Sequence, residues 1–387
     1  MKKIGLALLV VGLLVSLGLV SPTQKSFAAE PIKIGAILNY TGPAAMLGPL
    51  FKNGIVMALE EYNSQIAGRP LELIVEDAAG SPNVCLEKAR KLVERDKVKI
   101  IIGPLMGDAQ LALGPYLANK GVLATGLYCA MFELTKYQNW LIYPTTALGL
   151  TLPLGWYAAD KGHKTMVMII ADYAGGHAFM KGVRTGFEEK GGKVVQEVLV
   201  PVGTADFGPY ISNLKNADCV AFFVPNTGDS SRLVTQYKEF GVKMPLYGTT
   251  LAADLPEHVM KELGDKVVGL QGQALYIWSL DNPVNKKWVK AMEKRFGKTP
   301  GGLANNSYCI TSSILAGLKA TGGDETFSKL WPAVLKVKMD TPQGPLAYTK
   351  EGVALANGYI VEAKRINGRY SWDPIKVYPA VRDPRLK

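Results

Sequence analysis

The sequence predicts an α/β protein built from two doubly wound, Rossmann-like units. Three observations support this fold class. Short apolar runs alternate with amphipathic segments from residue 32 onwards, this rhythm stops and resumes once, and the pattern Pro-x-x-Gly-Asp follows an apolar run in each half, at residues 104–108 and 225–229. Alternation of this kind is typical of a parallel sheet with right-handed helical crossovers. The chain of 387 residues, 48% of them hydrophobic, is long enough for two separate cores.

Residues 1–28 have the pattern of a secretory signal peptide. Lys2 and Lys3 precede an apolar run over residues 4–20, and small residues stand at Ser26 and Ala28. This pattern predicts export to the periplasm, with cleavage near Ala28. The alternative is a retained membrane anchor, since the apolar run is at the short end of a membrane span. Because no cysteine lies near the cleavage site, we expect a protein that is not a lipoprotein.

The first unit is predicted from five segments. The runs IKIGAIL (32–38), LELIVED (71–77) and VKIIIG (98–103) have the apolar character of strands. Between them, residues 48–65 and 83–96 show the amphipathic spacing of helices. The order strand, helix, strand, helix, strand therefore predicts a parallel sheet.

The second unit repeats this order from residue 163. Its predicted strands and amphipathic segments are, in chain order, HKTMVMII (163–170), a helix over 178–192, KVVQEVLV (193–200), the segment 207–217, DCVAFFV (218–224), a helix over 230–241 and MPLYGTT (244–250).

The repeated Pro-x-x-Gly-Asp pattern predicts a cleft between the units. In both places a helical pattern follows the Gly-Asp pair, although an Asp after a glycine turn is also a routine helix cap. Two such units that face each other place helix N-termini across one cleft, at the carboxyl ends of the strands. Free backbone N–H groups at those N-termini favour anions.

Charge and cysteine usage exclude several classes of protein. The formal net charge is +11, and the chain after residue 28 holds 41 basic and 33 acidic residues. These charges are interspersed, as in residues 87–99, whereas a nucleic-acid binder more often clusters them, so we expect no nucleic-acid partner. The four cysteines are far apart and lack metal-ligand spacing, so mostly buried free thiols are expected at Cys85, Cys129, Cys219 and Cys309.

Signatures of an enzyme are thin. The three histidines have no metal-ligand spacing, and neither H-E-x-x-H nor G-x-S-x-G occurs. Residues 297–299, GKT, resemble the end of a phosphate loop, but Met292 stands where that loop requires its first glycine. No G-x-G occurs either, which argues against a dinucleotide site. We therefore expect no metal, no cofactor and no catalysis, and a protein that captures a ligand.

Several segments resemble one family, the type I periplasmic solute-binding proteins of ABC transporters in their leucine/isoleucine/valine-binding branch. The resemblance covers essentially the whole chain after the signal peptide. The segments that carry it are IKIGAILNYTGPAAMLGPLFKNGIVMALEEYN (32–63), IIIGPLMGDAQLALGPYL (100–117), DYAGGHAFMKGVRTGFEEKGG (172–192) and the run GPYISNLKNADCVAFF with the later LVTQYKEFGV (208–242).

The resemblance implies two lobes that close on a ligand about a hinge of three chain crossings. The first lobe would comprise residues 30–147 and 273–345, and the second residues 148–272 and 346–387. A member of this family is not enzymatic, and its liganded form docks on an ABC permease in the inner membrane. We expect this chain to act as a monomer in that role.

The resemblance also implies ligand-binding residues in the first lobe. In amino-acid-binding relatives, the loop that matches residues 105–108 offers a serine hydroxyl and backbone N–H groups to the ligand carboxylate. Here Gly107 takes the serine position between Met106 and Asp108, which leaves only backbone donors. Asp108 is either a helix cap or a partner for a ligand ammonium, and the whole loop is alternatively no more than a tight turn.

A second loop, residues 124–134, matches a ligand-binding segment of the family, where Leu127, Tyr128 and Cys129 stand. Leu127 and Cys129 are alternatively core residues, whereas the ring and hydroxyl of Tyr128 suit a cleft. From the second lobe, the resemblance implies that Tyr173 or the backbone of Gly175 reaches the ligand.

Three further positions depart from the family pattern. Asn226 stands where many relatives have a cleft-facing tyrosine, and Leu47 replaces another cleft aromatic. Thr250 stands where amino-acid binders place the glutamate that pairs with the ligand ammonium. A buried ammonium needs such a partner. We therefore expect a small carboxylate with an apolar or aromatic body and no α-ammonium. The alternatives are an ordinary branched-chain amino acid binder and, more distantly, a secreted hydrolase.

Overall fold

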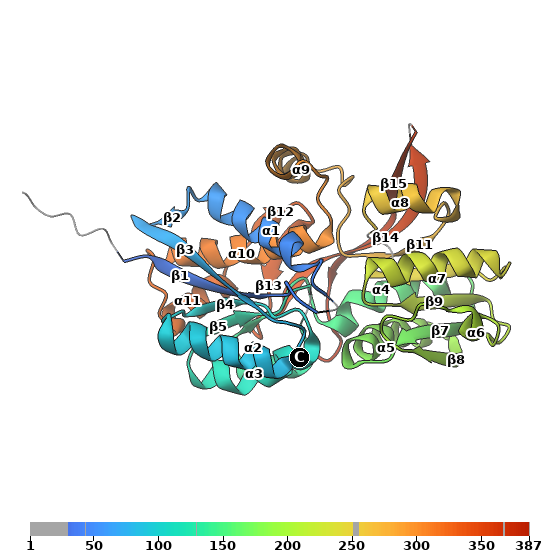
Figure 1. Cartoon of the computed structure of the whole chain (residues 1–387), viewed down its shortest axis with the longest axis horizontal. Helices are drawn as coiled ribbons and strands as arrows, with labels where there is room; N and C mark the ends of the chain where they lie inside the picture. Colours follow the sequence, from blue (N-terminus) through green and yellow to red (C-terminus); the bar gives the residue numbers. More distant parts are fainter. Residues whose placement is uncertain (1–29, 43, 129, 251–254, 367, 387) are drawn as a thin grey trace, which may run out of the picture.

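The computed structural model describes residues 30–386 except 43, 129, 251–254 and 367. These residues form two α/β units side by side along the long axis of the molecule (Figure 1), so the predicted fold class is confirmed. The predicted signal peptide, residues 1–28, and Cys129 lie outside the described residues. Of the described helices, none is long and apolar enough to cross a membrane.

The first unit is built on a six-stranded sheet in the order β2-β3-β1-β4-β5-β6. Neighbouring strands run parallel except β2, which pairs antiparallel with β3. The strands are β1 (Ile32–Leu38), β2 (Gln65–Ile66), β3 (Arg69–Asp77), β4 (Ile100–Ile102), β5 (Leu123–Thr125) and β6 (Trp140–Leu141). The predicted strand over residues 32–38 is confirmed with the same bounds.

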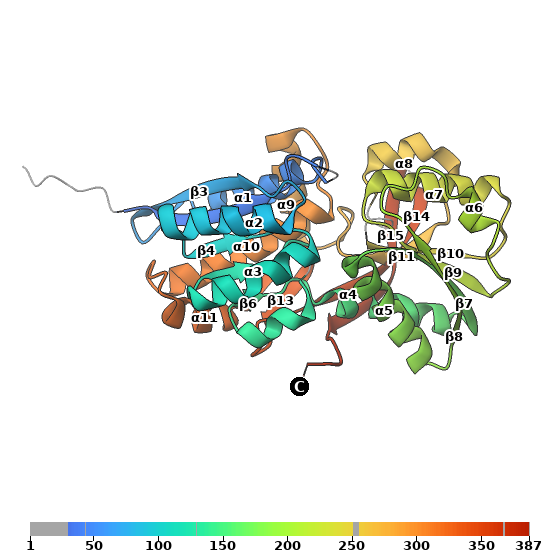
Figure 2. The same ribbon diagram turned by 60° about the horizontal axis from the view of Figure 1, so that its bottom comes forward.

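Helices cover both faces of this sheet. On one face α1 (Gly48–Glu61) packs on α10 (Gly302–Ala320), and on the other α2 (Pro82–Arg90) packs on α3 (Gly107–Asn119) (Figures 1 and 2). Two further helices in this part of the chain are α9 (Pro283–Phe296) and α11 (Phe327–Leu335). The predicted helix over residues 83–96 is continuous only to Arg90 and ends in a wider turn, Lys91–Arg95.

A nine-stranded sheet belongs mainly to the second unit, and the two strands at one end of it, residues 339–341 and 344–348, lie beside the first unit (Figures 1 and 2). The order of this sheet is β12-β13-β14-β11-β10-β9-β7-β8, and β15 also pairs with β14. The strands are β7 (Thr165–Ala171), β8 (Lys193–Val200), β9 (Cys219–Phe223), β10 (Leu246–Thr249), β11 (Gln271–Ala274), β12 (Met339–Thr341), β13 (Gly344–Tyr348), β14 (Ala354–Ile366) and β15 (Arg369–Val381). From β8 to β11 the pairing is parallel, and β14 then pairs antiparallel with β11.

Helices again cover the sheet of the second unit. α4 (Ala147–Asp160) packs on α5 (Ala174–Glu189), and α7 (Thr227–Glu239) packs beside α8 (Glu257–Leu263) on the other face (Figure 1). The predicted amphipathic segment 207–217 forms only one helical turn, α6 (Gly208–Ile211). Polar residues from Ser212 onwards form turns with their side chains and backbone, which competes with continuation of the helix.

Three segments join the two units. Residues 142–146 connect β6 to α4, and residues 275–282 connect β11 to α9. Residues 349–357 comprise the link from β13 to β14 and the first four residues of β14. The predicted lobe boundaries, 30–147 with 273–345 and 148–272 with 346–387, stay a prediction, because lobes are defined by how they move.

The last residues of the chain return to the first unit. After β15, the buried carboxylate of Asp383 accepts a hydrogen bond from the hydroxyl of Thr146, and Leu386 packs among core residues of the first unit. The guanidinium of Arg385 lies over the ring of Phe132, with 4.0 Å from its central carbon to the ring centroid. Residues 383–386 thus contact the first unit, although the sequence predicted 346–387 as part of the second lobe.

The three cysteines in the described part of the chain are free and buried, as predicted: Cys85, Cys219 and Cys309. Burial raises the pKa of the Cys85 thiol to about 11 and that of the Cys219 thiol to about 12. Thiols with such pKa values stay protonated near neutral pH and are poor nucleophiles.

Candidate ligand-binding site

A cavity lies between the two units. The empty space inside it amounts to about 840 Å³, including volume open to solvent. Its walls come from both units and, among the described residues, include no Asp, Glu, Lys, Arg or His. The residues on the wall are Ala44, Leu47, Leu105, Met106, Gly107, Gln110, Leu127, Tyr128, Met131, Ala147, Tyr173, Gly175, Phe179, Val202, Phe223, Pro225, Asn226 and Leu303.

Most residues that the sequence singled out lie on this wall. They are Leu47, Met106, Gly107, Leu127, Tyr128, Tyr173, Gly175 and Asn226. Their roles in ligand binding stay predictions. Cys129 lies outside the described residues.

Asp108 and Thr250 are not among the described residues on the wall, and the ligand-binding roles given to them stay predictions. Asp108 is exposed in the first turn of α3, where a carboxylate complements the helix dipole. Thr250 is fully buried at the end of β10, inside the second unit.

The glycine turn before α3 brings backbone N–H groups to the wall. Gly107 is the first residue of α3, and the residue before it, Met106, makes no side-chain cap. A Cβ atom built at Gly107 would lie 2.8 Å from the sulfur of Met131, which is also on the wall. The absence of a side chain at Gly107 thus lets Met131 lie against the start of the helix.

The start of α5, on the opposite side of the cavity, likewise has a glycine on the wall and no side-chain cap. Its N-cap residue, Tyr173, makes no side-chain cap. A Cβ atom built at Gly175 would lie 2.5 Å from an edge carbon, Cε2, of the Tyr173 ring and 2.9 Å from its hydroxyl oxygen. The Tyr173 ring therefore folds over Gly175, and only glycine leaves room for that placement.

The start of α7 is different because a side chain of the protein already binds a backbone N–H group there. Asn226 accepts a hydrogen bond from the backbone N–H of Asp229 at 2.7 Å and donates one to its carboxylate at 2.7 Å. Asp229 in turn accepts a bond from the backbone N–H of Gly203 at 3.1 Å and pairs with Arg232. Asn226 thus fixes the wall of the second unit, and its amide is already engaged.

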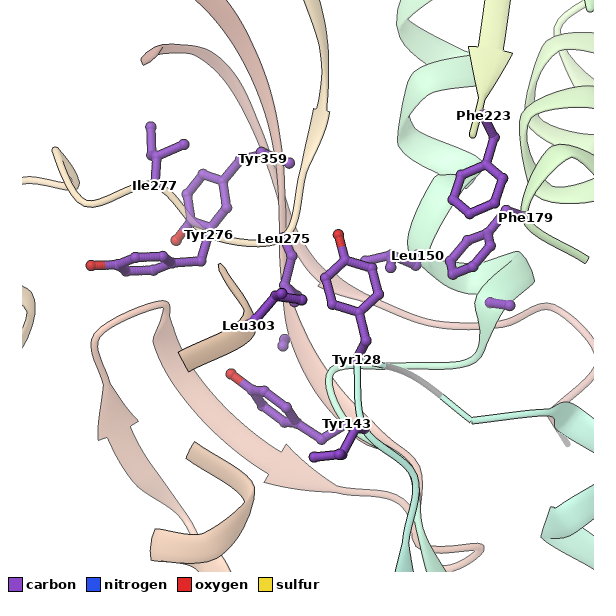
Figure 3. Packing of buried hydrophobic residues seen from close by; sticks show 14 of the residues in the cluster. Tyr128, Tyr143, Leu150, Phe179, Phe223, Leu275, Tyr276, Ile277, Leu303 and Tyr359 are labelled. Atoms are coloured by element: carbon purple, nitrogen blue, oxygen red, sulfur yellow. The ribbon is translucent and has the colours of Figure 1, made fainter. Parts of the chain in front are cut away.

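Aromatic rings from both units meet in the cavity. Phe179 of α5 stacks on Phe223 of β9, with ring centroids 4.6 Å apart. Tyr128 of the first unit meets Phe179 edge to face at 6.4 Å, and Tyr173 lies 6.3 Å from Phe223. Figure 3 shows the Tyr128 ring extending from its own loop, with Phe179 and Phe223 to one side of it.

Gln110 joins the two loops of the first unit that form the wall. Its side-chain NH₂ donates to the backbone oxygens of Pro104 and Leu105, both at 3.1 Å. Its side-chain oxygen accepts from the backbone N–H of Met131 at 3.3 Å. The buried carboxamide thus ties the turn before α3 to the loop that follows Tyr128.

A carboxylate of β3 holds the loop that carries Leu47. Asp77 accepts hydrogen bonds from the backbone N–H groups of Tyr40, Thr41 and Ala79 and from the Thr41 hydroxyl. Burial raises the pKa of the Asp77 carboxyl, but these hydrogen bonds outweigh it and lower the pKa to about 2. Asp77 is therefore ionised and structural in this loop.

Sequence reasoning missed Gln110, Phe179 and Phe223. The two phenylalanines belong to apolar patterns that core strands and helices share, so their residue type carried no signal. The one available signal for Gln110 was a polar residue within the mostly apolar helical pattern that follows Gly107. The structure shows that it is buried, and buried polar side chains are hydrogen-bonded. Among the described residues, no group of three or more His, Cys, Asp or Glu side chains is placed to hold a metal ion.

Comparison with protein families identifies the whole two-unit fold. Residues 31–369 match the family model described as periplasmic binding protein. The chain is similar to a Leu/Ile/Val-binding protein homolog 6 from Brucella suis, at 26% identity over all of both chains.

Solved structures with the same fold are also similar to this chain. An ABC transporter substrate-binding protein from Sphaerobacter thermophilus is 29% identical, with a TM-score of 0.86 over 91% of this chain and 99% of that one. A solute-binding protein of an ABC transporter from Rhodopseudomonas palustris BisB5, in complex with 3,4-dihydroxybenzoic acid, is 27% identical, with a TM-score of 0.84 over 92% of this chain and 99% of that one.

Proposed function

Because the chain belongs to the type I periplasmic binding proteins, we propose that it is the solute-binding subunit of an ABC importer for a small aromatic carboxylate. The observation that carries this proposal is the interlobe cavity, whose described wall is apolar and aromatic and has no Asp, Glu, Lys, Arg or His side chain. Apolar pockets with a few oriented polar groups are typical of small-molecule sites.

The body of the ligand is assigned to the aromatic part of the wall. Phe179 and Phe223 present stacked rings, and Tyr128 and Tyr173 lie at their edges. A planar ring is stabilised there by burial and by offset or edge-to-face contacts, each worth about 0.5–1.5 kcal/mol beyond burial. The 3,4-dihydroxybenzoic acid in the similar protein from Rhodopseudomonas palustris is a ligand of this class.

The carboxylate of the ligand is assigned to backbone donors at the helix N-termini. Gly107 at the start of α3 and Gly175 at the start of α5 both lie on the wall, and neither helix has a side-chain cap. Such N–H groups bind anions without a basic side chain. The start of α7 is excluded from this role because Asn226 caps it.

The amino acid alternative is favoured by the names of the relatives, such as the Leu/Ile/Val-binding homolog from Brucella suis. An α-amino acid brings an ammonium group into the closed cavity, and a buried ammonium needs an acid or several oriented acceptors. The described wall has no acid, and Asp108 and Thr250 lie off it. We therefore favour ligands without the ammonium. The secreted hydrolase receives no support from the wall, which lacks a His, Asp or Glu to act as a base.

The partner and the compartment complete the proposal. The similar proteins from Sphaerobacter thermophilus and Rhodopseudomonas palustris are named as proteins of ABC transporters. We infer an ABC permease of the inner membrane as the partner of this chain, and the periplasm, reached through the signal peptide of residues 1–28, as its compartment.

Calorimetry with matched pairs of ligands tests the choice of ligand. We expect 3,4-dihydroxybenzoate or 3-phenylpropanoate to bind with a micromolar or tighter dissociation constant, and leucine and phenylalanine to give no heat. Tight binding of leucine with no response to any deaminated or aromatic acid would contradict this choice of ligand and show that the protein is a branched-chain amino acid binder.

Two glycine variants test the carboxylate site. Gly107→Ala forces the Met131 sulfur away from the start of α3, so we expect weaker binding of the same acid. Gly228 holds the equivalent place in the second Pro-x-x-Gly-Asp turn, where an added Cβ meets its nearest neighbour only at 3.4 Å. Gly228→Ala is therefore the control, and equal effects of the two variants would contradict the assignment.

A further inference from the structure

Asn306 lies directly behind the loop that follows β5 and carries Tyr128, called the Tyr128 loop below. It belongs to α10, and its side chain is buried, with 0% of the residue exposed. Its side-chain oxygen accepts a hydrogen bond from the backbone N–H of Tyr128 at 2.8 Å, and its NH₂ group donates to the backbone oxygen of Tyr143 at 3.2 Å. One carboxamide thus joins a loop of the cavity wall to the first segment between the units.

The backbone at Tyr128 needs such an anchor. Its φ angle is +72°, in the left-handed region that bulky side chains rarely adopt. A strained conformation persists only where the surrounding structure holds it, and such sites are concentrated at functional positions. In this conformation the Tyr128 ring meets Phe179 of the second unit (Figure 3).

Beyond Tyr143, buried hydrogen bonds continue to another segment between the units. The Tyr143 hydroxyl donates to the side-chain oxygen of Gln343 at 2.7 Å. The NH₂ group of Gln343 donates to the backbone oxygen of Asn357 in β14 at 3.1 Å, and its backbone oxygen accepts from the Tyr359 hydroxyl. The Tyr128 loop, the first segment and the third segment between the units are thus connected through buried polar groups.

We propose that Asn306 is a positioning residue for ligand binding: it holds Tyr128 in the left-handed conformation that points its ring across the cavity, and it links that loop to the first interlobe segment. That a ligand binds in this cavity at all rests on the proposed function. The link means that a change in the Tyr128 loop on ligand binding is transmitted to the hinge through Tyr143.

A buried asparagine that only stabilises the fold offers the necessary comparison. Asn139 belongs to the same unit, is 2% exposed, and donates to the backbone oxygen of Val122 at 2.8 Å. It has no hydrogen bond to the cavity wall or to an interlobe segment among those described. Asn139→Ala therefore matches Asn306→Ala in burial and in loss of an amide, but not in position.

The first measurement needs no ligand. The protein is labelled with 3-fluorotyrosine, and the ¹⁹F resonance of Tyr128 is assigned by its absence in Tyr128→Phe. We expect Asn306→Ala to shift or broaden this resonance in the ligand-free protein, and Asn139→Ala to leave it unchanged. Asn306→Asp should change the resonance less than Asn306→Ala does, because an acceptor for the Tyr128 N–H remains. Asn306→Ser, which cannot reach both partners, replaces Asn306→Ala if that variant does not fold.

The second measurement is the affinity for 3,4-dihydroxybenzoate. We expect Asn306→Ala to raise the dissociation constant at least tenfold and Asn139→Ala to change it less than twofold, at comparable losses in melting temperature. An unchanged Tyr128 resonance in folded Asn306→Ala or Asn306→Ser, or equal effects of the two asparagine variants, would overturn the proposal. If the unaltered protein binds no aromatic acid, the proposed function fails, and the resonance alone decides the role of Asn306.

Discussion

Gly175 has no side chain because the ring of Tyr173 occupies the space where a Cβ atom would lie. The ideal Cβ position is 2.5 Å from an edge carbon of that ring, and the ring can swing away, whereas backbone cannot. Gly175→Ala should therefore displace the Tyr173 ring from the wall of the cavity. We expect the dissociation constant for 3,4-dihydroxybenzoate to rise about tenfold, equal to about 1.4 kcal/mol, with little change in melting temperature.

The neighbouring glycine provides the contrast for that measurement. A Cβ atom at Gly176 would lie 2.0 Å from the backbone oxygen of Ala171, the last residue of β7, which pairs with a strand on each side. Gly176→Ala should lower the melting temperature, because this backbone has no room to move. A stability loss in Gly175→Ala as large as that in Gly176→Ala would contradict the role given to Tyr173.

The sequence allowed residues of the cavity wall to be predicted only where they lie at a turn or carry a polar group on an aromatic ring. Gly107 and Tyr173 follow apolar strands at glycine turns, and these positions in α/β folds face a cleft. Phe179 and Phe223 carry no such mark, since apolar residues in a helix or strand are usually core. Thr250 was placed on the wall by its match to a family position, but it is fully buried and is not among the described residues of the wall.

Among the elements near the cavity, the loop after β1 depends on one carboxylate. Asp77 receives hydrogen bonds from Tyr40, Thr41 and Ala79, which hold the loop that leads to Leu47. Asp77→Asn should lower stability by about 1 kcal/mol and weaken ligand binding, because the charge-assisted bonds are lost. Thermal unfolding and calorimetry of the variant measure the two effects.

The low pKa of Asp77 also predicts the pH range of this contribution. The folded protein lowers the pKa of the carboxyl from its ordinary value of 3.8 to about 2. The stabilisation is therefore fully present above pH 4 and is lost as the pH falls toward 2. Stability curves of the unaltered protein and Asp77→Asn should converge over that range, and parallel curves would show that these bonds do not depend on the charge.

The C-terminal tail is an element whose partner the sequence did not indicate. Strand β15 belongs to the sheet of the second unit, yet Leu386 packs in the core of the first unit and Asp383 binds Thr146. A few residues after a strand show no periodicity, so only the folded chain reveals their contacts. The alternating segments, by contrast, predicted three strands of the first sheet (β1, β3 and β4) and four of the second (β7 to β10), because burial requires apolar runs of that length. The short strands β2, β5 and β6 and the later strands β11 to β15 were not predicted.

Removal of the tail tests its contribution to stability. Deletion of residues 382–387 exposes the surface under Leu386, and we expect a loss of about 2 kcal/mol from that side chain alone. Val377→Ala is a suitable control, since Val377 is 45% exposed on β15. A melting temperature equal to that of the unaltered protein after the deletion would show that the tail only rests on the first unit.

In the whole molecule, side chains from the two units meet at the cavity. The edge-to-face contact of Tyr128 with Phe179 spans the cavity, and three chain segments and the tail connect the units around it. A ligand that contacts both walls binds more tightly to the arrangement in which the walls are close together. Ligand binding should therefore shift the population of the protein toward a closed form.

Small-angle scattering measures this closure directly. We expect a smaller radius of gyration with saturating 3,4-dihydroxybenzoate than without it, and no change with leucine, which lacks a partner for its ammonium in the described wall. Asn306→Ala should reduce the difference between the two states even at saturation, because its bond to Tyr143 links the Tyr128 loop to the hinge. Equal radii in both states of the unaltered protein, with binding confirmed by calorimetry, would mean that the units hold a fixed angle and that the ligand enters a cavity already formed.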